Sequence, residues 1–259
     1  MSKQAKPGAA QATKQQPVQV DWSQYGATGF EKTSAEDLGI PFLAIVQKGS
    51  PEVDRTHKDY ATKKIEGAEA GCVINTVTRN IVHSPDSDPV IFIPGAYEKL
   101  FVQWKARDTG GGFVRQHTNP AVLNECVRNE KNQDVLPNGD LVVTTGYFFG
   151  MVKVGDDEWE RAIISMTSTQ LKKARMWLNM MMAIKSNGRP LPMFSHKYAL
   201  TTVAEQNASG SWFGWHIEGA GMCTSQQLIS EAAEIAKKIS TGARPQLGPP
   251  AATTDDVPM

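Results

Sequence analysis

The segment GAYEKLFVQWKAR, residues 95–107, has a cation or an aromatic ring at most of its alternate positions. Side chains of a β-strand alternate between two faces. One face would then carry Tyr97, Lys99, Phe101, Gln103, Lys105 and Arg107. The other face, with Leu100, Val102 and Trp104, is mostly apolar and should face a core. Because cations contact phosphates and aromatic rings stack on bases of any identity, the first face predicts a site for single-stranded nucleic acid.

The residues around this strand add to the predicted site. The loop after it contributes Phe113 and Arg115. A β-bulge would exchange the two faces and bring Trp104 to the binding side. The alternative interpretation is a solvated sheet face that carries two incidental aromatic residues.

A second group of cations lies between Arg161 and Ala204, an interval without Asp or Glu. Its segment TSTQLKKARMWLNMMMAI predicts a helix that opens with a capping box formed by Thr167 and Gln170. The apolar stripe of this helix should face the core, and it consists of Leu171, Ala174, Leu178 and Met181. Trp177 fits core packing better than a cofactor site.

The cations of this helix, Lys172, Lys173 and Arg175, then point away from the apolar stripe. A neutral protein that concentrates cations in this way forms a local positive patch. We predict that the patch contacts DNA phosphates, although a solvated helix face is the alternative. Two such features in one chain favour the nucleic-acid interpretation more than either alone.

The remaining elements indicate an α+β fold with an antiparallel β-rich core, most simply a curled sheet or small barrel. Strands are expected at residues 38–46, 72–82 and 89–107, the last broken near Pro94–Gly95. Two hairpins are expected, at residues 141–166 and 197–217. Residues 225–239 predict a second helix.

Composition divides the chain into three regions. Residues 1–29 are expected to be a disordered basic arm, because their first twenty residues have no acidic and almost no large apolar side chains. Residues 30–240 should form the folded domain. Residues 241–259, rich in Pro, Gly, Ala and Thr, should form a flexible tail with an acidic tip.

Other chemistry has no support in the sequence. No nucleophile, phosphate-loop or metalloprotease motif is present, and the histidines have no metal-ligand spacing, so we expect no enzyme, cofactor or metal site. The net charge is zero, and the three cysteines are far apart, which fits a reducing compartment. No apolar run is long enough for a membrane span, and no signal peptide is evident.

The last residues, ATTDDVPM, resemble the C-terminal tip of bacterial single-stranded DNA-binding proteins, where a flexible linker ends in acids, a small hydrophobe, proline and phenylalanine. The residues that match in order are Asp255, Asp256, Val257 and Pro258, and Met259 stands in place of the phenylalanine. The resemblance implies that these five residues bind replication or recombination proteins.

The stretches GIPFLAIVQKGSPEVD and ISMTSTQLKKARMWLNMM are similar to a family of bacteriophage proteins, some of them described as single-stranded DNA-binding proteins. The resemblance implies an elaborated oligonucleotide-binding (OB) type barrel that works in phage replication and recombination, in the cytoplasm of the bacterial host. We therefore expect non-sequence-specific binding of single-stranded DNA. The alternatives are a strand-annealing recombinase and a structural or virion assembly protein, and the sequence leaves open whether the protein is a homo-oligomer.

Overall fold

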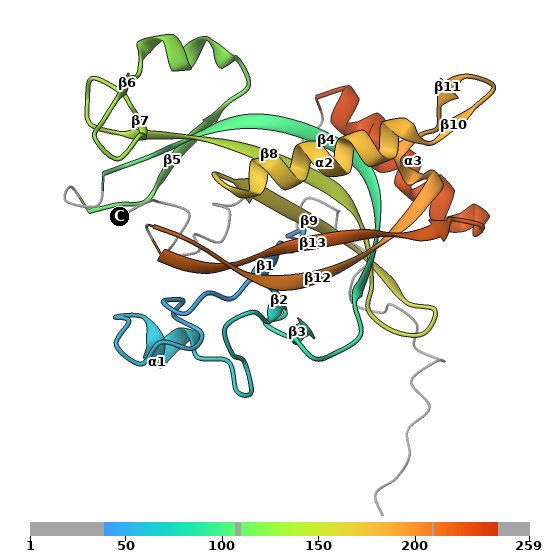
Figure 1. Cartoon of the computed structure of the whole chain (residues 1–259), viewed down its shortest axis with the longest axis horizontal. Coiled ribbons are helices and arrows are strands. Elements are labelled where there is room, and N and C mark those ends of the chain that lie inside the picture. The colour runs from blue at the N-terminus through green and yellow to red at the C-terminus, as the bar shows by residue number, and fades with distance from the viewer. Residues whose placement is uncertain (1–38, 107–109, 209, 243–259) are drawn as a thin grey trace, which may run out of the picture. The chain divides into compact units, whose positions relative to one another are not determined.

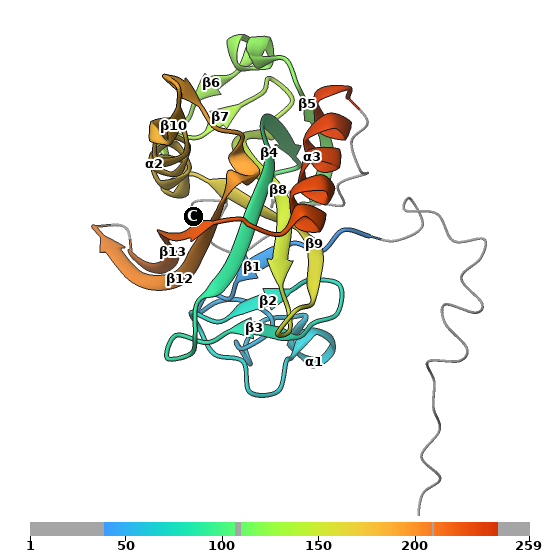
Figure 2. The same cartoon turned by 90° about the vertical axis from the view of Figure 1, so that its right-hand side faces the viewer.

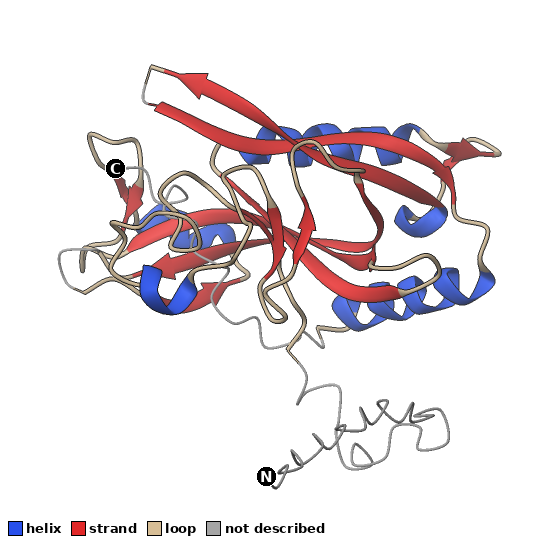
Figure 3. Ribbon diagram, turned by 90° about the horizontal axis from the view of Figure 1, so that it is seen from below, coloured by secondary structure: helices blue, strands red, loops and turns tan. Residues whose placement is uncertain are grey.

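The computed structural model describes residues 39–106, 110–208 and 210–242 (Figure 1). The chain divides after Leu38, and all described residues belong to the second unit, Gly39–Met259. They form an α+β fold around one large, curled antiparallel sheet, which confirms the predicted fold class at this level (Figures 1 and 3).

The main sheet has eight strands in the order β13-β12-β4-β8-β7-β6, with β5 beside β4 and β9 beside β8. All pairings are antiparallel. The hairpins predicted at residues 141–166 and 197–217 are confirmed as β8–β9 and β12–β13. The strands are β4 (Val90–Trp104), β5 (Phe113–His117), β6 (Val127–Arg128), β7 (Asp134–Val135), β8 (Leu141–Lys153), β9 (Trp159–Thr167), β12 (His196–Asn207) and β13 (Gly210–Met222).

The central strand β4 is continuous where the sequence predicted a break at Pro94–Gly95. The pairing with β8 only shifts its register between Pro94 and Ala96. Gly95 is needed here because a helix packs directly on it. A Cβ atom at this position would lie 2.9 Å from the backbone oxygen of Ala232 and 3.1 Å from Cβ of Ile235.

Two long helices, α2 (Gln170–Ala183) and α3 (Gln226–Ser240), cover opposite faces of the sheet (Figure 2). Trp177 of α2 is fully buried and stacks on Phe148 of β8, with ring centroids 4.3 Å apart. Ile235 of α3 belongs to a separate core cluster with Phe149, the next residue of β8. Since neighbouring strand residues point to opposite faces, these contacts place α2 and α3 on different sides.

The two helix starts differ from one another. Ser225 caps α3, because its hydroxyl accepts a hydrogen bond from the backbone N–H of Leu228. The capping box predicted for α2 is wrong. Thr167 ends strand β9, the cap residue Thr169 makes no side-chain capping bond, and Gln170 uses its side chain elsewhere.

A small sheet of β1 (Leu43–Ile45), β2 (Val73–Asn75) and β3 (Ile81–His83) precedes the main sheet. The single strand predicted at residues 72–82 is therefore a hairpin. Residues 41–47, which we call the bridging segment, contact two strands that lie at edges of the curled sheet, β9 and β13. The backbone oxygen of Pro41 accepts a hydrogen bond from Ile163 of β9, and Gln47 binds the backbone of Phe213 in β13.

The β12–β13 ribbon is paired with the rest of the sheet over only part of its length. The β12–β13 ribbon continues to Asn207, although β12 pairs with β4 only at residues 198–200, so most of the ribbon is two-stranded. Its free end projects beyond the rest of the sheet (Figure 3). The short elements are α1 (Tyr60–Lys63), β10 (Lys185–Ser186), β11 (Arg189–Pro190), and the 3₁₀ helices η3 (Pro120–Glu125) and η4 (Met193–Ser195).

Candidate nucleic-acid interface

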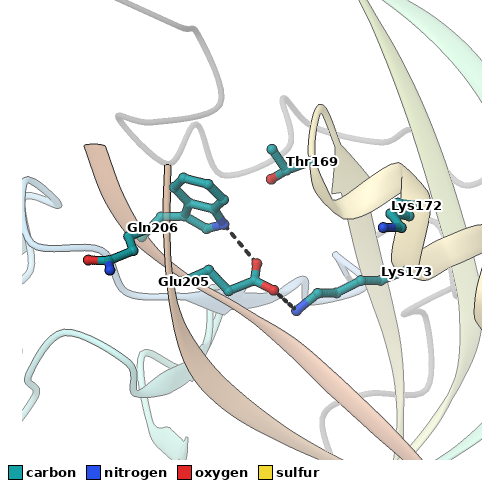
Figure 4. Close-up of a pocket in the computed structure, with 6 residues that line it drawn as sticks. Thr169, Lys172, Lys173, Glu205 and Gln206 are labelled. Carbon is teal, nitrogen blue, oxygen red and sulfur yellow. Dashed lines mark hydrogen bonds and ion pairs between the residues drawn. The ribbon is translucent and has the colours of Figure 1, made fainter. Parts of the chain in front are cut away.

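A pocket of about 360 Å³ lies between the start of α2 and the outer part of the β12–β13 ribbon (Figure 4). We call it the α2–β13 pocket. Its lining residues are Thr169, Lys172 and Lys173 on the α2 side, and Glu205, Gln206 and Trp212 on the ribbon. The pocket thus brings two lysines and an indole ring together, the two kinds of group that hold a single strand.

One carboxylate in the pocket binds both a cation and the indole. Glu205 and Trp212 are cross-strand partners. Oε1 of Glu205 lies 2.7 Å from Nζ of Lys173, and Oε2 accepts a hydrogen bond from Nε1 of Trp212 at 2.9 Å (Figure 4). The Lys173 and Glu205 side chains are 15% and 30% exposed, which makes this the most enclosed ion pair among the described residues.

The start of α2 is fixed by hydrogen bonds to the free edge of β13. Oε1 of Gln170 accepts from the backbone N–H of Trp215 at 3.1 Å, and Nζ of Lys173 donates to the oxygen of Trp215 at 2.6 Å. Two residues earlier, Gln47 binds both backbone groups of Phe213. Side chains thereby occupy an edge that would otherwise be open to another strand.

Gly214 provides the space for these contacts. A Cβ atom there would lie 2.5 Å from Nε2 of Gln170, 2.6 Å from Oε2 of Glu205 and 2.9 Å from Nζ of Lys173. Three polar groups therefore converge above this glycine. Of these, Nε2 of Gln170 is buried and has no hydrogen-bond partner among the described residues.

The three cations predicted on the helix differ in their environment. Lys172 and Lys173 both line the pocket. Lys173 is neutralised by Glu205, whereas Lys172 is exposed and forms no ion pair within the described ranges. Arg175 is exposed, and its Nε donates to the backbone oxygen of Leu171 at 3.4 Å.

The aromatic part of the predicted strand surface is wrong. Phe101 is only 5% exposed, because Val122 of η3 and Leu136 of the following loop cover it. Tyr97 is half-buried and packs on Phe148, with ring centroids 4.8 Å apart. This burial raises the pKa of the Tyr97 hydroxyl. The Phe101 ring is therefore not available to stack on a base, and the Tyr97 ring is engaged with Phe148.

Phe113 and Arg115, which were predicted in a loop, lie in strand β5. Phe113 does not share a surface with the cations. It packs against Trp104 on the α3 side of the sheet, with centroids 5.9 Å apart. Arg115 is exposed and lies on the other side, where its Nε donates to Gln103. The expected burial of Leu100 is confirmed, and Trp104 is half-buried.

Lys99 and Lys105 are exposed, as predicted. Lys99 is two residues from Tyr97 and shares its face, which is the side that α2 covers. Lys99 pairs with Gly146 of β8, and Gly146 pairs in turn with Met166, which lies near the end of β9 just before α2 begins. The cation is therefore on the same side of the sheet, and near the same end of α2, as the pocket.

A network of polar side chains connects β5 to Gln103 of β4 and to Asp140. Gln103, buried, donates from Nε2 to Oδ2 of Asp140, and its Oε1 accepts from Arg115 and from Nε2 of His117 at 2.9 Å. Burial, and secondly the charge of Arg115, lowers the pKa of His117, and Glu125 opposes this shift. The neutral imidazole is thus favoured at this position.

Several predicted residues fall outside the described part of the chain. Arg107 is one, and the others are the whole C-terminal tip, Asp255, Asp256, Val257, Pro258 and Met259, together with the N-terminal arm, residues 1–29.

The sequence interpretation missed four residues that line the pocket, Thr169, Glu205, Gln206 and Trp212. It also missed the contact of Gln170 with β13. Trp212 had a detectable signal, since it alternates with the partly buried Phe213 and the buried Trp215 in a predicted strand and must face away from their core. Glu205 had none, because only the register of the hairpin places it beside Trp212 and only the fold brings it to Lys173.

Among the described residues, no group of three or more His, Cys, Asp or Glu side chains is arranged to hold a metal ion. None of the helices in the described ranges has the length and apolarity that crossing a membrane requires.

Comparison with known proteins gives a family for this fold. A family model described as Pam3 phage gp34-like protein matches residues 9–245. The chain belongs to this family. Neither the curated proteins nor the solved structures include a significant match. The description of the Pam3 phage gp34-like family names a phage protein and no activity, so function must be argued from the pocket itself.

Proposed function

We propose that the protein binds single-stranded DNA without sequence preference, with the α2–β13 pocket as the centre of its site. The proposal depends on one observation, which is that Lys172, Lys173 and Trp212 line the same pocket. Lysines follow the phosphates of a strand, and an indole stacks on any base. Trp212 is half-exposed on a projecting ribbon, so a base can approach its ring.

Exposed cations extend the site beyond the pocket. Lys99 lies on the α2 side of the sheet, and Arg175 follows one turn after Lys172 in the helix. Arg115 and Lys105 are exposed at the outer end of β4 and β5. These positions supply phosphate contacts, whereas the aromatic contact is assigned to Trp212 in place of Tyr97, Phe101 and Phe113.

The broader role follows from the same proposal. A curled sheet in which the bridging segment contacts both β9 and β13 is compatible with an OB-type barrel, a fold that binds single strands. We propose that the protein acts in phage replication or recombination in the cytoplasm of the host, and that Asp255–Met259 recruit partner enzymes. An annealing assay with complementary strands separates this role from that of a strand-annealing recombinase.

The test is a fluorescence-monitored titration with oligo(dT) across a series of salt concentrations. The logarithm of affinity should fall linearly with the logarithm of salt, with a slope of about −0.7 for each phosphate contact to a single strand. Lys172→Ala should weaken binding and reduce this slope by about 0.7. The matched control is Lys238→Ala, which removes one exposed cation from α3 on the opposite side of the sheet.

The proposal fails if the wild-type protein has no affinity for oligo(dT) at low salt. That result would favour a structural or virion assembly protein. Equal losses of oligo(dT) affinity in the Lys172 and Lys238 variants would show that the binding site is not at the pocket.

A further inference from the structure

We propose that the Glu205 carboxylate is an internal substitute for phosphate: in the free protein it occupies Lys173 and Trp212, and a DNA phosphate takes over both groups on binding. This inference rests on the proposed function. It assigns Glu205 the role of a built-in competitor that regulates the affinity of the α2–β13 pocket.

The first support is the kind of group that Glu205 binds. One carboxylate oxygen is 2.7 Å from the Lys173 ammonium, and the other accepts the indole N–H of Trp212 at 2.9 Å. An ammonium and an N–H are donors that phosphate oxygens accept equally well. The two donors come from α2 and from β13, and the carboxylate lies between them.

The second support is a donor that Glu205 leaves unused. Nε2 of Gln170 is buried without a partner among the described residues. It lies within 2.5 Å of the Cβ position of Gly214, beside Oε2 of Glu205 and Nζ of Lys173. Each carboxylate oxygen of Glu205 already has one partner and neither reaches Nε2 of Gln170, whereas a phosphate offers further acceptor oxygens. A phosphate at this place can therefore satisfy Gln170 as well as Lys173 and Trp212.

The exchange has a consequence for the salt dependence of binding. A phosphate that Lys173 neutralises releases its condensed cation, but the displaced Glu205 carboxylate becomes an unpaired anion and attracts a cation in its place, so the net release at Lys173 is close to zero. Lys172 has no carboxylate partner in the described part, so its phosphate contact gives a net release. The wild-type slope should therefore count Lys172 but not Lys173, although both line the pocket.

The experiment is the oligo(dT) titration with Glu205→Gln. Glutamine keeps the size of the side chain and an acceptor for Trp212, but it removes the charge that neutralises Lys173. We expect affinity at low salt to rise about tenfold, the effect of one charge-assisted contact. The salt slope should become steeper by about 0.7, because the phosphate at Lys173 still releases its cation and no displaced carboxylate takes one up.

The matched control is Glu218→Gln. Glu218 is an exposed carboxylate on β13, the other strand of the same ribbon, and is paired with His216 at 3.0 Å, so its removal changes the net charge of the ribbon equally. It should leave the slope unchanged. Equal slopes in wild type and the Glu205 variant would overturn the inference while oligo(dT) binding itself stands. Equal steepening in both variants would also overturn it, because the effect would then be general.

A readout without DNA separates the inference from the proposed function. The indole ¹⁵N–H signal of Trp212, identified by its loss in Trp212→Phe, is followed while inorganic phosphate is added. The signal should shift, and it should do so at lower phosphate concentration in Glu205→Gln than in wild type. If this holds and oligo(dT) does not bind, the anion site stands and the proposed function fails. If phosphate leaves the signal unchanged in both proteins, the inference is wrong.

Discussion

The side-chain amide of Gln47 forms both hydrogen bonds with the backbone of Phe213, a residue 166 positions away. Nε2 donates to the oxygen of Phe213 at 2.9 Å, and Oε1 accepts from its N–H at 2.8 Å. Gln47 is buried, so it acts as one residue of an additional strand on the edge of β13. This contact attaches the bridging segment to the ribbon that carries the pocket.

Gln47→Ala should lower the free energy of unfolding by about 2–3 kcal/mol, because two backbone groups lose their partners. Chemical denaturation measures the change. Gln226→Ala, at an exposed position of α3, is the control and should change stability little. A Gln47 variant as stable as this control would show that the contact does not hold the bridging segment.

Trp212→Ala should weaken oligo(dT) binding by about 1–3 kcal/mol, the contribution of one stacked base. Trp212→Phe keeps an aromatic ring and should retain most of the affinity, although it loses the N–H that binds Glu205. The same titration measures both variants. Full affinity in the alanine variant would remove the ring from the binding site.

Phe101→Ala should lower the free energy of unfolding by about 3–5 kcal/mol, because the ring fills a buried cluster with Val122, Leu136 and Val142. Phe101→Leu fills most of the same volume and should bind oligo(dT) as wild type does. Denaturation and titration of the two variants test this assignment. A leucine variant of normal stability but weak binding would restore the ring to the DNA surface.

His117 should make stability depend on pH. Its pKa is lowered in the folded protein by burial and by Arg115, so the unfolded chain binds protons more readily. The pKa of histidine in the unfolded chain is about 6.5, so the contribution of His117 to the free energy of unfolding should be fully present above that pH. The free energy of unfolding should decrease as the pH falls below it. Denaturation at a series of pH values measures this dependence. His117→Gln, which keeps a donor for Gln103, should reduce it, and an unchanged profile would contradict the assignment.

The sequence predicted the elements better than the surfaces they form. The segments of β8, β9, β12 and β13 are rich in strand-forming residues and are separated by turn residues, and both hairpins follow from that pattern. The alternation in residues 96–106 is clear, yet it could not show that η3 and Leu136 would cover Phe101. Alternation along a strand shows which residues share a face, but it does not show which of the two faces a distant segment of the chain will cover.

The same limit applies to the helix and its cations. The sequence signalled Lys172 and Lys173 through the local absence of acids, and the pocket contains both. Gln170 was assigned to a capping box from its spacing to Thr167, but its side chain binds the backbone of Trp215. The acid that neutralises Lys173 is 32 residues away in sequence, at Glu205, so a local charge count could not include it.

Deletion of residues 255–259 should leave thermal stability unchanged, because the role proposed for these residues requires them to be free. Asp255, Asp256 and the terminal carboxylate are anions that compete with DNA for the protein's own cations at a concentration set by the tail. The truncated protein should bind oligo(dT) slightly more tightly at low salt. It should also lose a partner enzyme in a pull-down from infected cells. Retention of every partner would contradict the recruiting role.

The bridging segment also determines when the domain can finish folding. Residues 41–47 leave the ribosome early, but their partners Ile163 and Phe213 are synthesised much later. Until β13 emerges, the apolar side chains of β1 and the buried amide of Gln47 lack the surface they pack on. Contacts of such high sequence separation slow folding, since a long loop must close first. The nascent chain therefore passes through a stage with exposed strand edges, in which its need for chaperones is greatest.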